Sequence, residues 1–397
     1  MAAAPDRRRA NRPGEPDAPP VEHVGQVWRV RSAAVARQVL RERRHTTQAG
    51  FTAEAIPKGY LKHHPILISD GPQHDEQRTK VARFFAPKVV AQRYTALMES
   101  CADRLLEEAG SGILRLDELA LLYTVEVTAE AVGLTESAVP AMARRLESFF
   151  NQPPFDLTRA DLGRTPKQWA LAAKNGLLPV LAFWWADVRP AVRARRKKPR
   201  QDVISHLIAE GYTAADILVE CVTYGTAGMV TTREFIAMAA WHLLRDDDLR
   251  RRYLVADEPE RFAILHEIIR LEPVVGHLYR RVQQPITFDH GAVAHTAQPG
   301  DLIDLCVRPA NADAATVGGE PLNLCPRRPL PPGVNQAVLS FGDGAHKCPG
   351  QPMAILESDV LLRRLLAREV TVVSEPSIAW DDLIAGYQLR GFELRLG

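Results

Sequence analysis

A ten-residue run, Phe341 to Gly350, restricts the structure of this chain more than any other segment. It reads Phe-Gly-Asp-Gly-Ala-His-Lys-Cys-Pro-Gly and precedes a strongly helical stretch, Met353 to Arg368. Two glycines separated by one residue allow a sharp turn and a close approach of the backbone to a flat or bulky ligand. Because proline suits the first position of a helix, Pro349 makes Cys348 the predicted cap residue of that helix.

A cysteine at this position favours the thiolate over the thiol. The free amides of Gly350 and Gln351 and the positive end of the helix dipole would all face its sulfur. The loop alone leaves two alternatives open, a buried unreactive cysteine and a zinc ligand paired with His346. Tetrahedral zinc needs more ligands at short spacing than this solitary His-x-Cys pair. The loop therefore indicates a thiolate that is suited to bind a metal, with the unreactive cysteine still open as the alternative.

Composition describes an ordinary folded chain of 397 residues, with 46% hydrophobic and 25% charged residues. A formal net charge of +2 does not favour nucleic-acid binding, and the basic run Arg189 to Arg200 lacks interleaved aromatic residues. The five scattered cysteines contain no Cys-x-x-Cys pair and favour a reducing, cytoplasmic location. We expect no membrane span, because every apolar run of ~18 residues is interrupted.

The hydrophobic pattern predicts a mainly α-helical protein with small β-sheets, an α+β class. Residues 1–22 are expected to be a disordered arm and residues 23–397 a single catalytic domain. The expected elements are a strand at Val27–Val30, a helix at Ser32–Arg43, helices through most of Asp75–Leu244, a small antiparallel sheet within Ile286–Val307 and a β-like patch at Gln388–Leu396.

A capping box at Thr213 to Asp216 predicts a long helix that ends near Leu244. Inside it, the run from Gly225 to Thr232 contains two glycines, each of which costs about 0.5–1 kcal/mol relative to alanine. That cost is tolerable where a ligand must approach the backbone. We expect the Thr231 hydroxyl to bond back to the Ala227 carbonyl and loosen the helix. The alternative is a helix crossing eased by small residues.

The run Phe-Gly-x-Gly-x-His-x-Cys-x-Gly resembles the haem-binding loop of the cytochrome P450 superfamily, with no substitution at a fixed position. The likeness extends from about residue 23 to the end of the chain. It implies the mainly helical haem-thiolate fold and haem b, iron protoporphyrin IX, as the cofactor. By this resemblance, the haem contacts in the loop are the iron ligand Cys348, the propionate contact His346, the ring contact Phe341, and the glycines Gly342 and Gly350.

Other short motifs agree with the resemblance. Glu267 and Arg270 match the family's E-x-x-R structural pair, which an arginine from a later loop completes. Arg327 and Arg328 are both candidates for that arginine. The residues that resemble the family's propionate-binding cations are His74, Arg78 and Arg280, and Asn311 and Asp313 resemble its loop after the haem-side sheet.

The long helix contains a match to the family's oxygen-activation motif, with one departure. The matching residues are Ala227, Gly228, Thr231 and Thr232. Val230 stands where the family has aspartate or glutamate, a carboxylate that relays protons to dioxygen, so one proton route is absent. Water near Thr231 or a polar group on the substrate is one replacement, and an oxidation other than simple hydroxylation is the other interpretation.

The resemblance implies an oxidoreductase that uses dioxygen to oxidise a small organic substrate, typically by hydroxylation in secondary metabolism. Val230 leaves two alternatives, an oxidase that catalyses aromatic coupling and a haem protein that binds ligands without turnover. The chain has no flavin or nicotinamide fingerprint and is too short for a fused reductase, so ferredoxin and ferredoxin reductase are the expected partners. The expected substrate pocket includes Phe51–Ile68, Phe149–Phe155, Met229, Val274, Val275, Tyr387 and Gln388.

Overall fold

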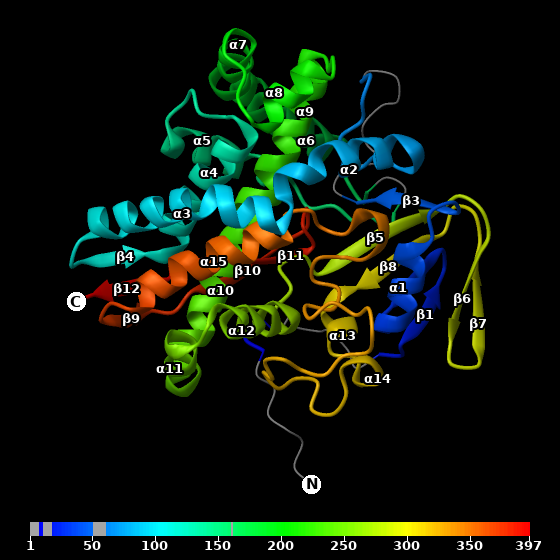
Figure 1. The fold of residues 1–397 in the computed structure, drawn as a ribbon. Coiled ribbons are helices and arrows are strands. Elements are labelled where there is room, and N and C mark those ends of the chain that lie inside the picture. Colours follow the sequence, from blue (N-terminus) through cyan, green and yellow to red (C-terminus); the bar gives the residue numbers. More distant parts are fainter. Residues whose placement is uncertain (1–7, 11–17, 51–60, 160–161) are drawn as a thin grey trace. The chain divides into compact units, whose positions relative to one another are not determined.

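The computed structural model describes residues 8–10, 18–50, 61–159 and 162–397. These residues form a mainly helical structure with small sheets (Figure 1), which confirms the predicted class. The chain divides into two compact units. The first comprises residues 1–54, 241–351 and 378–388, and the second comprises residues 55–240, 352–377 and 389–397. The prediction of a single catalytic domain at 23–397 stays a prediction.

The first unit is built on a five-stranded sheet with the strand order β1-β2-β8-β5-β3. Strands β2 and β8 run parallel, and the other neighbouring pairs run antiparallel. Its strands are β1 (Val21–Val24), β2 (Val27–Val30), β3 (Thr46–Ala49), β5 (His277–Val282) and β8 (Leu302–Cys306), with a separate hairpin of β6 (Ile286–His290) and β7 (Val293–Ala297). Its helices are α1 (Ala33–Arg41), α11 (Asp247–Val255), α12 (Glu258–Leu271), α13 (Val307–Asn311), α14 (Ala314–Val317) and the 3₁₀ turn η4 (Gly344–His346).

Helix α1 packs its apolar face on this sheet. Val35 and Val39 share one buried core with Val30, Ile303 and other residues of β2, β8 and β5. The strand at Val27–Val30 agrees with the prediction, and the predicted helix at Ser32–Arg43 is observed as Ala33–Arg41. The first unit therefore has its own hydrophobic core.

The second unit is mostly helical. Its elements are α2 (Gly71–Phe85), α3 (Pro87–Ala109), β4 (Ile113–Arg115), α4 (Leu116–Val132), α5 (Val139–Ser148), α6 (Pro166–Phe183), the π-helix η2 (Trp184–Val188), α7 (Arg189–Lys197), α8 (Val203–Ala209), α9 (Ala214–Tyr224), the π-helix η3 (Gly225–Val230), β9 (Val370–Ser374) and β12 (Glu393–Leu396). Helix α4 is buried along most of its length and packs against α3, α5 and η3. A helix that is buried over most of its surface fits such a central position, although Glu118 and Glu130 are exposed.

Four elements carry residues of both units. They are α10 (Thr231–Arg245), α15 (Gln351–Leu366), β10 (Ser377–Asp381) and β11 (Gly386–Arg390). The predicted long helix is thus observed as α9, η3 and α10, and Thr213 and Asp216 form the predicted capping box.

Two predicted β regions are arranged differently from the expectation. In the region Ile286–Val307, only β6 and β7 form the small antiparallel sheet, and β8 joins the larger sheet. The patch at Gln388–Leu396 contains two strands in different sheets, since β11 pairs with β10 while β12 lies between β4 and β9. Alternation identifies a strand but not its partner, which lies elsewhere in the sequence.

Three chain-wide expectations can be compared with the described residues. No helix among them is long and apolar enough to cross a membrane. All five cysteines lie among the described residues, and none of them forms a disulfide there. In the basic run, Arg195 is buried and pairs with Asp202 and Glu136, so one of its charges belongs to the core.

Candidate functional site

The cysteine loop, residues 341–350, is closed by its own backbone. The Cys348 amide donates a hydrogen bond to the Phe341 carbonyl at 2.7 Å. Gly342 and Gly344 both adopt positive φ angles, 68° and 67°, which L side chains rarely adopt. Phe341 is buried, whereas residues 342–350 are all partly exposed between the buried segments at 337–339 and 355–362. The loop therefore presents a face that the protein itself does not cover.

Gly344 also brings the loop close to helix α1. A Cβ atom on Gly344 would lie 2.1 Å from the Leu40 carbonyl oxygen, far inside van der Waals contact. The glycine pattern predicts a close backbone approach, and here the partner is the protein's own helix.

An ion-pair cluster holds the same loop. Asp343 accepts a 2.8 Å hydrogen bond from Arg37 and pairs with Arg41 at 3.1 Å. Burial raises the pKa of Asp343, but hydrogen bonds from Arg37, the Gly344 amide and Arg41 outweigh burial and lower it. The Asp343 carboxylate therefore stays charged and links the cysteine loop to helix α1. No local sequence pattern indicates this cluster, because the acid and the arginines lie about 300 positions apart.

The predicted role of Cys348 as helix cap is wrong. Helix α15 begins at Gln351, and Pro349 and Gly350 form a turn before it. Gly350 lies next to the thiol, since a Cβ on it would be in van der Waals contact with the Cys348 sulfur, at 3.8 Å. The sulfur therefore lies beside a turn that carries no side chain at Gly350.

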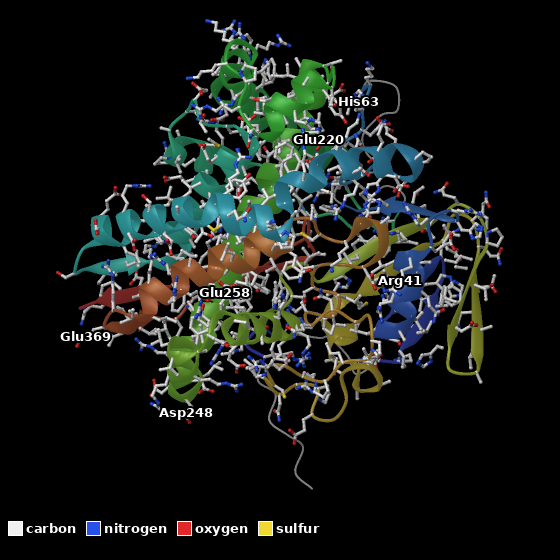
Figure 2. The ribbon with its side chains drawn as sticks, in the orientation of Figure 1. Arg41, His63, Glu220, Asp248, Glu258 and Glu369 are labelled. Carbon is white, nitrogen blue, oxygen red and sulfur yellow. The ribbon has the colours of Figure 1, made fainter. Side chains whose placement is uncertain are left out.

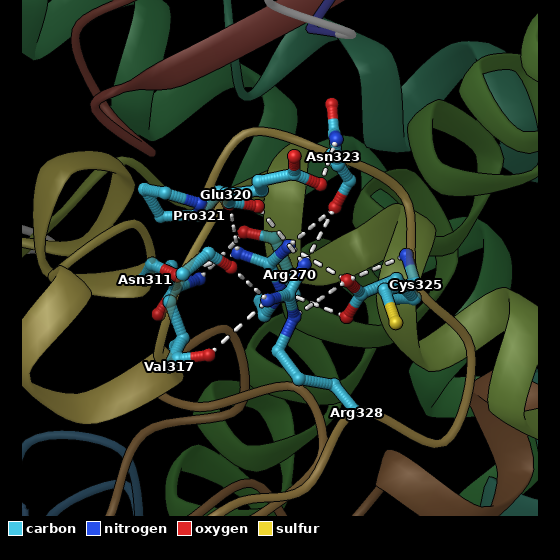
Figure 3. A network of polar contacts seen from close by, with 10 residues as sticks. Arg270, Asn311, Val317, Glu320, Pro321, Asn323, Cys325 and Arg328 are labelled. Carbon is cyan, nitrogen blue, oxygen red and sulfur yellow. Dashed lines mark hydrogen bonds and ion pairs between the residues drawn. The ribbon is translucent and has the colours of Figure 1, made fainter. Parts of the chain in front are cut away.

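Helix α12 carries the E-x-x-R pair in a buried position (Figure 3). Two parallel hydrogen bonds, each 2.7 Å long, connect the guanidinium of Arg270 to the Glu267 carboxylate. Glu267 also accepts hydrogen bonds from the Cys325 amide at 3.0 Å and from Arg328 at 3.1 Å. Arg328 is therefore the completing arginine. Arg327 is exposed and pairs with Glu260.

Asn311 connects this pair to the segment before the cysteine loop. Its side chain donates to the Arg270 carbonyl at 3.0 Å and accepts from the Leu339 amide at 2.8 Å. Asp313 caps α14 and accepts from the Ala33 amide at 3.0 Å. In the first unit, the E-x-x-R pair, the Asn311 segment and the run leading to Phe341 thus form one hydrogen-bonded frame.

The oxygen-motif residues lie in the second unit, around the π-helix η3. Thr231 donates to the Ala227 carbonyl at 2.5 Å, as predicted, and Thr232 donates to the Gly228 carbonyl at 2.8 Å. Thr124 of helix α4 donates to the Met229 carbonyl at 2.8 Å. Three consecutive carbonyls thus bind threonine hydroxyls, which stabilises a break in the α-helical hydrogen-bond pattern.

A buried carboxyl group that was not predicted from the sequence lies beside this break. Burial raises the pKa of Glu357, on α15, to about 8, and the neighbouring Thr232 hydroxyl lowers it in part. Glu357 is 1% exposed, so it carries a proton at neutral pH. Its signal in the sequence is a charged residue within the apolar stretch that starts at Ile355.

The three predicted propionate-binding cations are divided between the units. In the second unit, His74 and Arg78 lie one turn apart on α2, and His74 is 2% exposed. In the first unit, Arg280 is buried on β5 and donates hydrogen bonds to Gln48 and to the Tyr279 carbonyl. Their roles at a haem stay predictions.

The predicted pocket residues are mostly buried. Met229, Val274 and Tyr387 are each at most 5% exposed, and the Tyr387 hydroxyl donates to the Glu272 carbonyl at 3.1 Å. Val275 and Gln388 are partly exposed. Phe149 packs edge-on against Phe183, a core contact. Residues 51–60 of the predicted pocket loop lie outside the described part of the chain.

In a comparison with known proteins, one family model matches the segment that contains the E-x-x-R pair and the cysteine loop. The family model described as "Cytochrome P450" matches residues 262–374, which include the E-x-x-R pair and the cysteine loop. Cytochrome P450 130 of Mycobacterium tuberculosis is 28% identical over 337 residues, covering 80% of this chain and 74% of the relative. The erythromycin C-12 hydroxylase of Saccharopolyspora erythraea is 26% identical over 349 residues, covering 86% and 82%.

Solved structures show the same fold. CalO2 matches with a TM-score of 0.77 at 20% identity, covering 95% of this chain and 93% of that chain. CYP164A2 of Mycobacterium smegmatis in its ligand-free state matches with a TM-score of 0.75 at 23% identity, covering 93% and 91%.

Proposed function

Because the chain belongs to the cytochrome P450 superfamily of haem-thiolate monooxygenases, we propose that it hydroxylates a small organic secondary metabolite. The observation that carries the proposal is the cysteine loop, whose Cys348 lies beside a glycine turn on an uncovered face. Relatives support the substrate class, since one is an erythromycin C-12 hydroxylase and one structural relative binds erythromycin B.

The residues of the loop fit haem. A single soft sulfur donor is a typical ligand of haem iron, and the residues beside it, 342–350, are each partly exposed. When bound, thiolate-ligated haem supplies the electron density that favours cleavage of the O–O bond. We propose that Cys348 is that ligand, with Phe341, Gly342, His346 and Gly350 as the loop contacts and His74, Arg78 and Arg280 as the propionate contacts.

We propose that Glu357 supplies the acidic proton that a valine at position 230 cannot supply. Val230 is 1% exposed and cannot carry a proton. Glu357 holds a proton beside the Thr232 hydroxyl, next to the carbonyls that Thr231 and Thr232 bind. A neutral acid can donate a proton along a hydroxyl, so this pair offers a proton source in the second unit.

The thiolate assignment is tested by the absorption spectrum of the reduced, carbon-monoxide-bound protein. We expect the spectrum of a thiolate-ligated haem, and we expect Cys348→Ser to lose it. Cys325→Ser is the matched control, because Cys325 is exposed and should leave the spectrum unchanged. Retention of the thiolate spectrum in Cys348→Ser would overturn the assignment.

The proton source is tested by two variants with opposite expected effects. Glu357→Gln removes the proton but keeps the shape, and we expect a loss of product formation of about 10²-fold or more. Val230→Asp adds the missing acid, and we expect it to change the ratio of product to hydrogen peroxide. If neither variant changes turnover or this ratio, Glu357 and Val230 do not control proton delivery.

Val230 also favours a second candidate function, an oxidase that couples aromatic rings. Its apolar side chain removes the usual proton route near Thr231. Turnover with dioxygen, NADPH and surrogate ferredoxin partners distinguishes the candidates. Hydroxylated product supports the first, coupled product supports the second, and spectral shifts without product identify a ligand-binding protein.

Ferredoxin and ferredoxin reductase are the proposed electron donors, in agreement with the family resemblance. The partly exposed Lys347, next to Cys348, is the proposed docking charge. The cytoplasm is the proposed location, a compartment in which five free thiols persist. A spin-state screen of macrolides, polycyclic aromatics and cyclic dipeptides would identify the substrate class, and we expect macrolides to give the largest shifts.

A further inference from the structure

Three side chains with different donor atoms converge on one face of the five-stranded sheet. They are His277 on β5 and Asp304 and Cys306 on β8. This group does not include Cys348. Antiparallel pairing places His277 directly opposite Cys306. Asp304 precedes Cys306 by two residues, and side chains alternate between faces, so all three share one face. Among the described residues, they are the one group of three such donors that lie within 4.8 Å of one another.

The contacts within this group orient its donors inward. His277 Nδ1 lies 2.7 Å from Asp304 Oδ1, and the Cys306 sulfur lies 3.9 Å from the Asp304 carbonyl oxygen. The ring of Tyr279 lies parallel to the His277 ring, with 5.9 Å between centroids, and supports its orientation. Asp304 and Cys306 are buried, whereas 22% of the His277 side chain is exposed. Solvent therefore reaches the group on its histidine side.

The donor set is chemically specific. Imidazole nitrogen, carboxylate oxygen and thiolate sulfur together are typical ligands of zinc, at about 2.0–2.3 Å from the metal. Tetrahedral geometry at those bond lengths separates the donors by roughly 3.3–3.8 Å. The histidine and aspartate atoms, now 2.7 Å apart, need to separate by only about half an ångström to reach that spacing.

Charge balance also fits a divalent cation. Binding displaces one proton from the Cys306 thiol to solvent, and one thiolate and one carboxylate then neutralise the two charges of Zn²⁺. The strand register places Arg29 of β2 opposite Asp304. The guanidinium of Arg29 lies 4.0 Å from the Glu22 carboxylate. A neutral site is the form that a partly buried position tolerates best.

We propose that His277, Asp304 and Cys306 bind Zn²⁺, with water from the exposed side as the fourth ligand. The site does not include the proposed haem ligand Cys348, but strand β5, which carries His277, also lies close to the cysteine loop. Leu278 points to the opposite face of β5, where its Cδ1 atom lies 3.9 Å from the position a Cβ on Gly342 would take. Zinc would therefore stiffen the strand on which the loop rests.

The test loads the haem-containing protein with zinc chloride, removes unbound metal on a desalting column, and measures zinc per haem by mass spectrometry. We expect about one zinc per haem. Zinc-edge X-ray absorption should show one sulfur at about 2.3 Å and lighter donors at about 2.0–2.1 Å. These readouts are specific for zinc and do not depend on turnover.

Variants assign the ligands. Cys306→Ser should lose the sulfur neighbour, and His277→Gln and Asp304→Asn should each lower retained zinc at least tenfold. Cys325→Ser removes an exposed cysteine elsewhere and should retain zinc with its sulfur neighbour. The carbon-monoxide spectrum checks that each variant is folded, and His277→Gln, at a partly exposed position, serves if Cys306→Ser does not fold. The proposal is overturned if the wild-type protein retains no zinc, or if Cys306→Ser keeps the sulfur neighbour.

Discussion

Every N–H of the Arg270 guanidinium has an acceptor, which explains how this charge is tolerated at 0% exposure. Two N–H groups bind the Glu267 carboxylate and the other three bind backbone carbonyls, those of Asn311, Pro321 and Asn323. The planar fork of arginine matches this set and lysine does not. Arg270 therefore positions the loop segments around it and has no contact that requires a chemical role.

Arg270→Ala should destabilise the fold by about 3–5 kcal/mol, because it leaves the Glu267 carboxylate buried beside Arg328 with its main partner removed. Arg327→Ala is the matched control. That side chain is 58% exposed, so its loss should change the free energy of unfolding by less than about 0.5 kcal/mol. Urea unfolding of the haem-loaded proteins measures both. Equal effects of the two variants would contradict the assignment of Arg270 as the buried partner.

Glu220, labelled on helix α9 in Figure 2, is a second buried acid. Burial raises its pKa to about 8, although the Ile66 amide donates a 2.9 Å hydrogen bond to it. The folded protein holds this proton more tightly than the unfolded chain, where a glutamate titrates near 4.5. The contribution of Glu220 to stability is therefore fully present below about pH 4.5 and is lost as the pH rises towards 8.

Glu220→Gln should remove this dependence while its amide oxygen still accepts the Ile66 hydrogen bond. Relative to the variant, the wild-type protein should lose up to about 1.4 kcal/mol per pH unit between pH 5 and 8. Thermal unfolding at pH 5 and pH 8 measures the difference, with Glu107→Gln as an exposed control on α3. An unchanged difference in melting temperature at the two pH values would show that Glu220 does not titrate in this range.

Contacts between elements decide the shape of the cysteine loop. Helix α1 holds it in two ways, through the ion pairs of Arg37 and Arg41 with Asp343 and through the close approach of Leu40 to Gly344. The first contact is electrostatic and the second is steric. Together they attach the partly exposed loop to helix α1.

Comparing Gly344→Ala with Gly291→Ala distinguishes the effect of the close approach to Leu40 from the effect of backbone strain. Both Gly344 and Gly291 have φ angles above +60°, so alanine costs about 1–2 kcal/mol of strain at either position. Of these two glycines, only Gly344 has a neighbouring atom within 4 Å of the position that a Cβ would take. We expect Gly344→Ala to lower haem content severalfold and Gly291→Ala to leave it near the wild-type value. The molar ratio of haem to protein, measured by absorbance, shows whether backbone strain or the contact with Leu40 causes the loss.

At the scale of the whole molecule, each compact unit is assembled from three separate stretches of chain. Neither unit can be excised as a continuous segment, and α10 and α15 each carry residues of both. Such interleaving couples the folding of one unit to that of the other through the covalent chain.

We expect the haem-loaded protein to unfold in one cooperative transition. Loss of helix, followed by circular dichroism, and loss of haem absorbance should have coincident midpoints in guanidinium. A haem-free sample serves as the control for stabilisation by the cofactor. Two separated transitions for the helix signal would contradict the predicted single catalytic domain at residues 23–397.

Local sequence was sufficient for features that span one or two turns of chain. The capping box at Thr213 and Asp216, the Glu267–Arg270 pair and the hydrogen bond from Thr231 to Ala227 all join residues three or four positions apart. Helix geometry alone brings such residues together. The same holds for the glycine turns of the cysteine loop, because glycine determines its own backbone conformation.

Only the tertiary structure decided which distant residues meet. It selected Arg328 over Arg327, placed Glu357 beside Thr232, and brought His277 to Asp304 and Cys306. Sheet register and helix packing set these neighbours, and both depend on contacts tens to hundreds of positions apart that no local pattern encodes. Helix α15 starts two residues after Pro349, and the Cys348 amide is instead hydrogen-bonded to the Phe341 carbonyl, seven residues earlier in the same loop.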